Sequence, residues 1–157
     1  MSDSPSEIHP EAAVAPGYLA NHLARAFNRT VDAALKPHGM SMALIGPIML
    51  LSWKGPMRQR DLVQASAVRQ PAMVALLDKL EALGAIARAP NPDDRRASTV
   101  MLTERGAALA MIGRRALMEA NATALAGFTS SEQASVVAMM QRLVENVEAA
   151  AGHKHHV

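Results

Sequence analysis

The sequence lacks cysteine altogether and has only one tryptophan, one tyrosine and two phenylalanines among its 157 residues. Without cysteine, disulfides, thiolate nucleophiles and cysteine-rich zinc sites are excluded, and a reducing compartment suits the chain. So few aromatic rings leave almost no surface on which the bases of single-stranded nucleic acid could stack. The core must instead be aliphatic, built with help from eleven methionines.

Neither sign of charge dominates, and no apolar run is long. The formal net charge is +2 and the isoelectric point is near 9.4, so anionic partners are permitted but not required. The longest apolar run, from Met40 to Trp53, is too short to span a bilayer and contains Gly46 and Pro47. The N-terminus is acidic and contains prolines, unlike a secretory signal. We therefore expect a soluble, cytoplasmic protein of a single domain with no membrane partner.

Apolar residues at three- and four-residue spacings predict a mainly α-helical chain. Residues 85–88 and 98–101 are instead β-prone, and the turn formers between them predict a small β-hairpin. Caps at Ser41, at Thr103 and at Thr129 or Ser130 indicate where helices start. The expected order is a flexible leader over residues 1–16, helices over 17–36, 42–53, 58–65 and 69–83, the hairpin, helices over 104–126 and 130–150, and a histidine-rich tail over 151–157.

Two short helices separated by little more than Ser66 and Ala67 predict a helix-turn-helix, whose second helix enters the DNA major groove with its first residues nearest the bases. Pro71 is tolerated only in the first turn of a helix, so this helix should start near Arg69 or Gln70. Gln can pair with adenine, Arg with guanine, and small side chains allow close approach. Any helix pair with a short turn shows the same spacing, so the pattern alone also fits a helix pair with no DNA partner.

The charged turn at residues 91–96 (NPDDRR) adds a second candidate for DNA contact. Arg95 and Arg96 directly follow the turn, and the narrow minor groove concentrates negative potential that accepts an inserted arginine. The Asp94 carboxylate can hydrogen-bond turn amides and orient an arginine fork. The hairpin would then act as the wing of a winged helix-turn-helix. The alternative interpretation is a solvated charged turn.

These residues also resemble a known family. Asp94, Arg95 and Arg96, followed after five residues by Leu102 and Thr103 and then by Gly106, resemble the wing signature of the MarR family of bacterial transcriptional regulators. The segment VRQPAMVALLDKLEALGAIARAPNPDDRR, residues 68–96, resembles that family's recognition helix and wing. The similarity extends over about residues 17–150 and is most specific over 68–106.

The resemblance implies a winged helix-turn-helix lobe over about residues 42–102, with dimerisation helices over 17–36 and 104–150. It implies a regulator, usually a repressor, that binds a pseudo-palindromic operator in double-stranded DNA as a homodimer and responds to a small hydrophobic or phenolic effector. Together with the spacing it marks the candidate DNA-binding residues, which are Arg58, Arg69, Gln70, Pro71, Ala72, Val74, Ala75, Lys79, Asp94, Arg95 and Arg96.

Three positions depart from the family pattern. Arg58 stands where the family commonly has a capping threonine, Ala67 where the turn often has glycine, and Ala85 where leucine usually follows the glycine. These departures bear on the start of the first short helix and on the geometry of the turn. Arg58 can instead contact a phosphate.

Other side chains suggest further sites. His153, His155 and His156 could bind a metal, but a histidine-rich tail without fixed geometry usually stays solvated, so we predict no metal and no cofactor. His22 is a candidate for contacting an effector, and a packed interface histidine is the alternative. We find no nucleophile elbow, phosphate-binding glycine loop, zinc-binding HExxH or paired carboxylates, so the chain is not expected to be an enzyme. The alternative function is a winged-helix module that binds proteins and not DNA.

Overall fold

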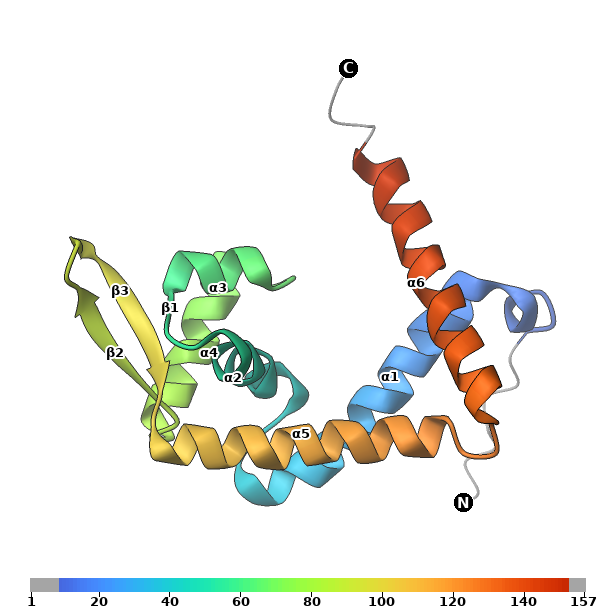
Figure 1. The fold of residues 1–157 in the computed structure, drawn as a ribbon, viewed down its shortest axis with the longest axis horizontal. Coiled ribbons are helices and arrows are strands. Elements are labelled where there is room, and N and C mark those ends of the chain that lie inside the picture. Colours follow the sequence, from blue (N-terminus) through green and yellow to red (C-terminus); the bar gives the residue numbers. More distant parts are fainter. Residues whose placement is uncertain (1–8, 153–157) are drawn as a thin grey trace. The chain divides into compact units, whose positions relative to one another are not determined.

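The structure is a computed structural model that describes residues 9–152 (Figure 1). The side chain of Arg95 lies outside the described part. Residues 1–8 of the expected leader, and His153, His155 and His156 of the expected tail, lie outside these residues. The chain divides into two compact units, Met1–Ala120 and Asn121–Val157. The elements in order are η1 (Ala12–Val14), α1 (Pro16–Leu35), η2 (Lys36–His38), α2 (Met42–Lys54), β1 (Met57–Arg58), α3 (Gln59–Ala65), α4 (Gln70–Ala82), β2 (Ile86–Asn91), β3 (Asp94–Leu102), α5 (Glu104–Ala124) and α6 (Ser130–Gly152).

Helix α2 is the central helix of the first unit and packs against α1, α3, α4 and β3. The sequence predicts its start correctly, because the Ser41 hydroxyl accepts a hydrogen bond from the Leu44 amide at 3.4 Å. The Asp32 carboxylate of α1 also accepts the Met42 amide at 2.6 Å. Two side chains thus satisfy amides of the first turn of α2, and one of them ties α1 to it.

The two short helices α3 and α4 are joined by a turn around Ser66, whose hydroxyl accepts the Val68 amide at 3.3 Å. Arg69 is the N-cap of α4 and Pro71 lies in its first turn, as the proline rule predicts. Gly84, with φ of +71°, ends the turn that follows α4. The buried face of α4 carries Met73, Leu77 and Leu80, and the exposed face carries Pro71, Ala75, Asp78 and Ala82.

The sheet has three antiparallel strands in the order β1-β3-β2, one more than the predicted hairpin. The extra strand pairs Met57 with Val100 and Arg58 with Thr99. The expected start of α3 at Arg58 is therefore one residue early, because Arg58 is extended and pairs with β3. The strands of the hairpin are also longer than predicted, because residues on both sides of the short turn, Asn91 and Asp94, pair with each other.

Helix α5 begins directly against the start of β2. The Thr103 hydroxyl donates to the Gly84 carbonyl at 2.5 Å and accepts the Gly106 amide at 3.1 Å, which confirms the predicted cap. A Cβ on Gly106 would lie 1.9 Å from the Ala85 carbonyl oxygen. Farther along α5, a Cβ on Gly113 would lie 2.3 Å from the Ile45 side chain of α2. Only glycine allows α5 to approach these groups so closely.

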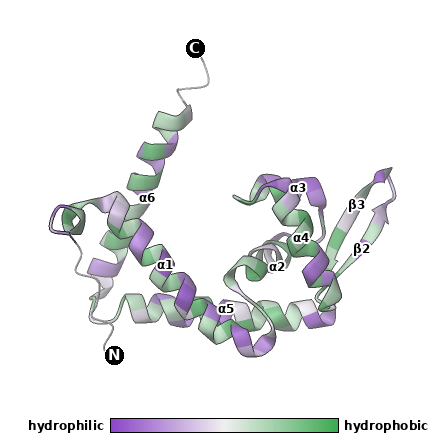
Figure 2. Cartoon of the chain, turned by 180° about the vertical axis from the view of Figure 1, so that it is seen from behind, coloured by the Kyte–Doolittle hydropathy of each residue, from purple (hydrophilic) through white to green (hydrophobic). Residues whose placement is uncertain are grey.

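The second unit contains α6, which starts at a capping box. The Thr129 amide donates to Glu132 at 2.7 Å and the Glu132 amide donates to the Thr129 hydroxyl at 3.2 Å. No residue of α6 over 130–152 is buried. Hydrophobic residues nevertheless recur along the helix (Figure 2), and its exposed large hydrophobic residues are Val137, Met139, Met140, Leu143, Val144 and Val147.

Within residues 9–152, no single helix is long and apolar enough to cross a membrane. The pair Pro16–His38 and Met42–Lys54 reaches that threshold only when its helices are taken together, and the two are bent by 81°.

Candidate nucleic-acid interface

The start of α4 presents most of the predicted groove-facing side chains to solvent. Arg69, Gln70, Pro71, Ala72 and Ala75 are exposed, and Val74 is half-buried. The Pro71 ring restricts the backbone of the first turn, and the Met73 amide donates to the Arg69 carbonyl at 2.9 Å, so these side chains project from a defined helix end. Lys79 is exposed in the last turn, about two and a half turns from the start of the helix.

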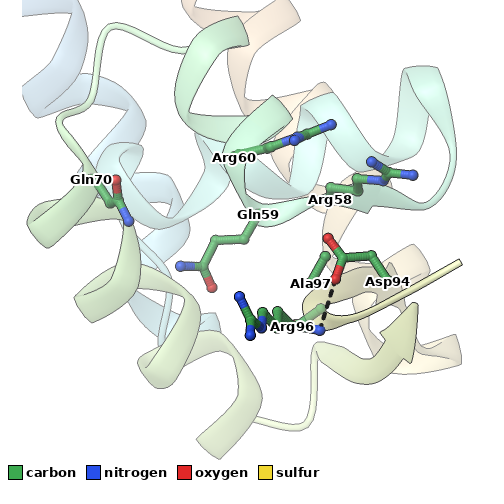
Figure 3. Close-up of a pocket in the computed structure, with 8 residues that line it drawn as sticks. Arg58, Gln59, Arg60, Gln70, Asp94, Arg96 and Ala97 are labelled. Atoms are coloured by element: carbon green, nitrogen blue, oxygen red, sulfur yellow. Dashed lines mark hydrogen bonds between the residues drawn. The ribbon is translucent and has the colours of Figure 1, made fainter. Parts of the chain in front are cut away.

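The second predicted group lies on β3, where Asp94 and Arg96 are exposed. The Asp94 carboxylate accepts the backbone amide of Arg96 at 3.0 Å, which fixes the backbone where the strand leaves the turn. Figure 3 shows the Arg96 guanidinium pointing away from this carboxylate, toward Gln59 and the side of the pocket that carries α4. Among the described side chains, no ion pair joins Asp94 and Arg96, so the predicted orienting role of Asp94 acts on the backbone in this structure.

A pocket of about 320 Å³ lies between the starts of α3 and α4 and strand β3 (Figure 3). We call it the basic pocket. It brings together four of the predicted residues, Arg58, Gln70, Asp94 and Arg96, from the three elements β1, α4 and β3. Among the described side chains, its lining is Arg58, Gln59, Arg60, Gln70, Asp94, Arg96, Ala97 and Ser98.

The charges of the basic pocket favour an anion. Three arginines and one aspartate line it, which gives 3 − 1 = +2. Arg60 lies 3.5 Å from Asp61, but both side chains are largely exposed, at 69% and 43%, so solvent screens that pair. The surface can therefore attract a phosphate backbone, whose charge supplies a large share of protein–DNA affinity.

Six of the predicted residues whose side chains are described do not line the basic pocket. Arg69, Pro71, Ala72, Val74, Ala75 and Lys79 lie along α4 outside it. Sequence reasoning missed Gln59, Arg60 and Ser98. Gln59 and Arg60 follow Arg58 directly, but only the pairing of β1 with β3 brings them to the wing. A two-residue strand has no periodicity from which to predict that pairing.

An ion-pair cluster ties the wing to α4. The Arg88 guanidinium of β2 lies 2.5 Å from the Asp78 carboxylate and 3.5 Å from the Glu81 carboxylate. The two acids are three residues apart, so they lie on one face of α4. The Arg88 side chain is 22% exposed while the acids are 62% and 49% exposed, so the cluster is partly screened. Its main effect is to fix where β2 lies along α4.

The other two candidate sites are a metal site and an effector site at His22. No group of three or more acidic or histidine side chains that could hold a metal ion occurs in residues 9–152. His22 is exposed on α1 and stacks on Tyr18 with ring centroids 6.3 Å apart. It does not line the small cavity of about 190 Å³ in the first unit, whose lining is Ala34, His38, Ile112, Arg115, Ala116 and Glu119.

The helix pair, the three-stranded wing and the exposed basic surface between them together define a winged helix-turn-helix protein of the DNA-binding class. Comparison with known proteins gives the family. The model of the MarR family matches residues 48–98. An HTH-type transcriptional repressor of Mycobacterium tuberculosis, Rv2887, is 31% identical over 127 residues, covering 81% of this chain and 91% of the relative. The repressor NicR of Pseudomonas putida is 27% identical over 94 residues, 60% of each chain.

Solved structures agree in fold. A MarR regulator from Methanosarcina mazei matches with a TM-score of 0.78 and 19% identity, over 85% of this chain and 96% of that one. A MarR mutant from E. coli, complexed with operator DNA, matches with a TM-score of 0.76 and 21% identity, over 86% and 98%. This chain belongs to the MarR family and is a DNA-binding transcriptional regulator. Its relatives are transcriptional regulators, which are not enzymes.

Proposed function

We propose that the chain is a repressor that binds a pseudo-palindromic operator as a homodimer and responds to a small effector. The observation that carries the DNA-binding part is the convergence of Gln70 of α4 and Arg96 of β3 on one basic pocket. A helix start for the major groove and a wing arginine for the minor groove are thus held at one surface. The relatives named as repressors support the direction of regulation.

The DNA-binding assignment is tested by selecting duplexes from a random-sequence library and measuring the affinity of the best one at several salt concentrations. We expect Arg96→Ala to weaken binding by about 1–3 kcal/mol while the far-UV circular dichroism stays unchanged. Gln70→Ala should change which bases are preferred. Arg105→Ala is the matched control, because Arg105 is exposed on α5 and does not line the basic pocket. An Arg96→Ala variant with wild-type affinity at every salt concentration contradicts the wing assignment.

The homodimer is supported by apolar side chains of α6, of which Met140, Leu143 and Val147 are exposed and Val136 is half-buried. Val136, Met140, Leu143 and Val147 recur every three or four residues, so they share one face of α6. Exposed apolar surface of this kind marks a protein interface, and a second copy of the chain supplies an identical face. Two linked lobes also let the recognition helices reach grooves about one duplex turn apart.

Sedimentation equilibrium tests the dimer. We expect twice the chain mass of 16.7 kDa for the wild type. Leu143→Glu should give the single mass, because a charge on the shared face must be desolvated on pairing. Ala138→Glu adds the same charge on the opposite side of α6 and should leave the dimer intact. A wild-type monomer that ignores duplex DNA would favour the alternative, a winged-helix module that binds proteins.

The effector is proposed to be a small organic acid bound in the cavity between α1, η2 and α5. Arg115 and His38 line this cavity of about 190 Å³ together with the carboxylate of Glu119, and Ile112 adds an apolar wall. A guanidinium suits a carboxylate, and the small volume suits a single ring. BpsR of Bordetella bronchiseptica, which matches with a TM-score of 0.74, is described as regulated by 6-hydroxynicotinic acid. To test this site, aromatic acids are titrated against the protein–DNA complexes of the wild type and of Arg115→Ala, which lacks the proposed partner of the carboxylate.

A further inference from the structure

The proposed function gives several side chains of the basic pocket no role in reading either groove. Gln70 starts the helix assigned to the major groove, and Arg96 lies on the wing. Arg58, Arg60 and Ser98 line the space between them. On a duplex, the ridge between a major groove and the adjacent minor groove is the sugar–phosphate backbone. Side chains that read neighbouring grooves must therefore straddle one backbone, and the pocket between them lies where it passes.

Arg58 is held rigidly at this place. Strand β1 pairs Met57 with Val100 and Arg58 with Thr99, so main-chain pairing fixes the Arg58 backbone beside β3. Arg58 is the N-cap residue of α3, yet its side chain makes no capping hydrogen bond. Within the described residues it also has no ion-pair partner. Its donors are thus available to a ligand, and they start from a fixed point.

Ser98 supplies a second observation. Its hydroxyl oxygen is buried and has no hydrogen-bond partner among the described residues. A buried hydroxyl without a partner destabilises the state that contains it. Rotation about the single χ1 angle between staggered positions can turn this hydroxyl toward the cavity. An anionic oxygen in the pocket would then accept its hydrogen.

We propose that the basic pocket holds one phosphate group of the DNA backbone, with Arg58 as the principal cation and the Ser98 hydroxyl as a neutral donor. This inference rests on the proposed function, because it assumes that α4 and the wing lie in adjacent grooves. The lining charge of 3 − 1 = +2 exceeds the single negative charge of a phosphodiester. Arg58 therefore fixes the position of the lobe along the backbone without reading a base.

The test uses a duplex selected by the wild-type protein, in which single phosphates are replaced one at a time by neutral methylphosphonates. We expect a replacement at one position in each half-site to weaken wild-type binding about tenfold or more, as for a lost hydrogen bond to a charged group. The same replacement should have no effect on Arg58→Ala. The salt slope of Arg58→Ala should fall by about 0.9 for each lobe, which is one phosphate contact. Arg58→Lys should recover part of the affinity, and Ser98→Ala should lose less than Arg58→Ala.

The controls distinguish a failure of the proposed function from a failure of the phosphate assignment. Arg105→Ala removes the same charge outside the pocket and should keep the full methylphosphonate effect. If the wild type binds no duplex, the proposed function fails. If it binds, and the Arg58→Ala variant is folded and still responds to every methylphosphonate as the wild type does, the phosphate assignment alone is overturned. Inorganic phosphate should displace DNA no better than chloride at equal ionic strength. Specific displacement without a position-dependent methylphosphonate effect would show that the pocket takes the free anion, and would also overturn the assignment.

Discussion

Helices α4 and α6 both carry large apolar side chains, but α4 buries them and α6 leaves them exposed. In α4, Met73, Leu77 and Leu80 are completely buried, although the helix has only 13 residues. In α6, with 23 residues, none is buried, and Leu143 is 47% exposed. Leucine contributes to stability when its apolar area leaves water, at about 25 cal/mol per Å². The winged lobe obtains this contribution within one chain, whereas α6 obtains it only when another surface covers it.

The comparison separates what the lobe needs from what α6 needs. The buried core of the winged lobe supports the surface that is proposed to contact DNA. A helix without tertiary packing, in contrast, is only marginally stable in water. Stability and assembly should therefore respond to different substitutions. Each of the following changes tests one side of this contrast.

The largest expected effect comes from Leu77→Ala. Removing this buried side chain should lower the free energy of unfolding by about 2–5 kcal/mol, because a cavity remains in the core. The matched change Leu143→Ala should lower it by less than about 0.5 kcal/mol, as for an ordinary surface position, when the chain is dilute enough to be monomeric. Urea unfolding followed by circular dichroism measures both. Equal losses would remove the contrast between the two helices.

A smaller effect is expected from Gly106→Ala at the start of α5. The added Cβ would meet the Ala85 carbonyl oxygen at 1.9 Å, so the backbone must shift. Overpacking of this kind costs about 1–3 kcal/mol. Gly17→Ala in α1 is the control, because outside its chain neighbours and the backbone of its own helix no atom lies within 4 Å of the added Cβ. The control should be neutral or stabilise the helix by about 0.5–1 kcal/mol. Thermal melts of the two variants should shift in opposite directions or by clearly different amounts.

The smallest expected effect concerns the capping box of α6. Hydrogen bonds from the backbone and side chain of Thr129 hold the pKa of Glu132 below its ordinary value. A carboxyl group whose pKa is lowered by folding contributes stability above its unfolded pKa and loses it as the pH falls through the lowered value. Amide exchange in the first turn of α6 should therefore speed up over that acidic range.

NMR titration of the Glu132 carboxyl measures the shift directly. Glu132→Gln should remove the pH dependence of exchange in this turn, while Glu145→Gln, farther along α6, should leave it unchanged. An unshifted carboxyl titration, or the same pH dependence in Glu132→Gln, would contradict the capping role.

Much of this fold could be predicted from local signals. Ser41, Thr103 and Thr129 mark helix starts because each hydroxyl accepts an amide that the helix leaves free. Pro71 places the start of α4 because its ring is compatible with the first turn only. Strand β1 was missed because two residues carry no periodic pattern, and its formation depends on β3, about 40 residues later in the chain.

The candidate site could be predicted only in part. The start of α4 and the charged turn were found from the sequence because helix geometry and turn chemistry are local. The contributions of Gln59, Arg60 and Ser98 to the basic pocket depend on three elements meeting in space. The direction of the Arg96 guanidinium, away from Asp94, is likewise a property of the packed wing, since nothing in the motif itself decides it (Figure 3).

The link from Arg88 to Asp78 and Glu81 has a consequence for the choice of operator. Because it holds β2 along α4, we expect the spacing between the helix and the hairpin to stay nearly constant. When the protein binds a duplex, the distortion should therefore fall mainly on the DNA, whose bending and groove width depend on sequence. We therefore expect base pairs that no side chain touches to matter, with easily deformed steps favoured wherever the narrow groove must meet the hairpin.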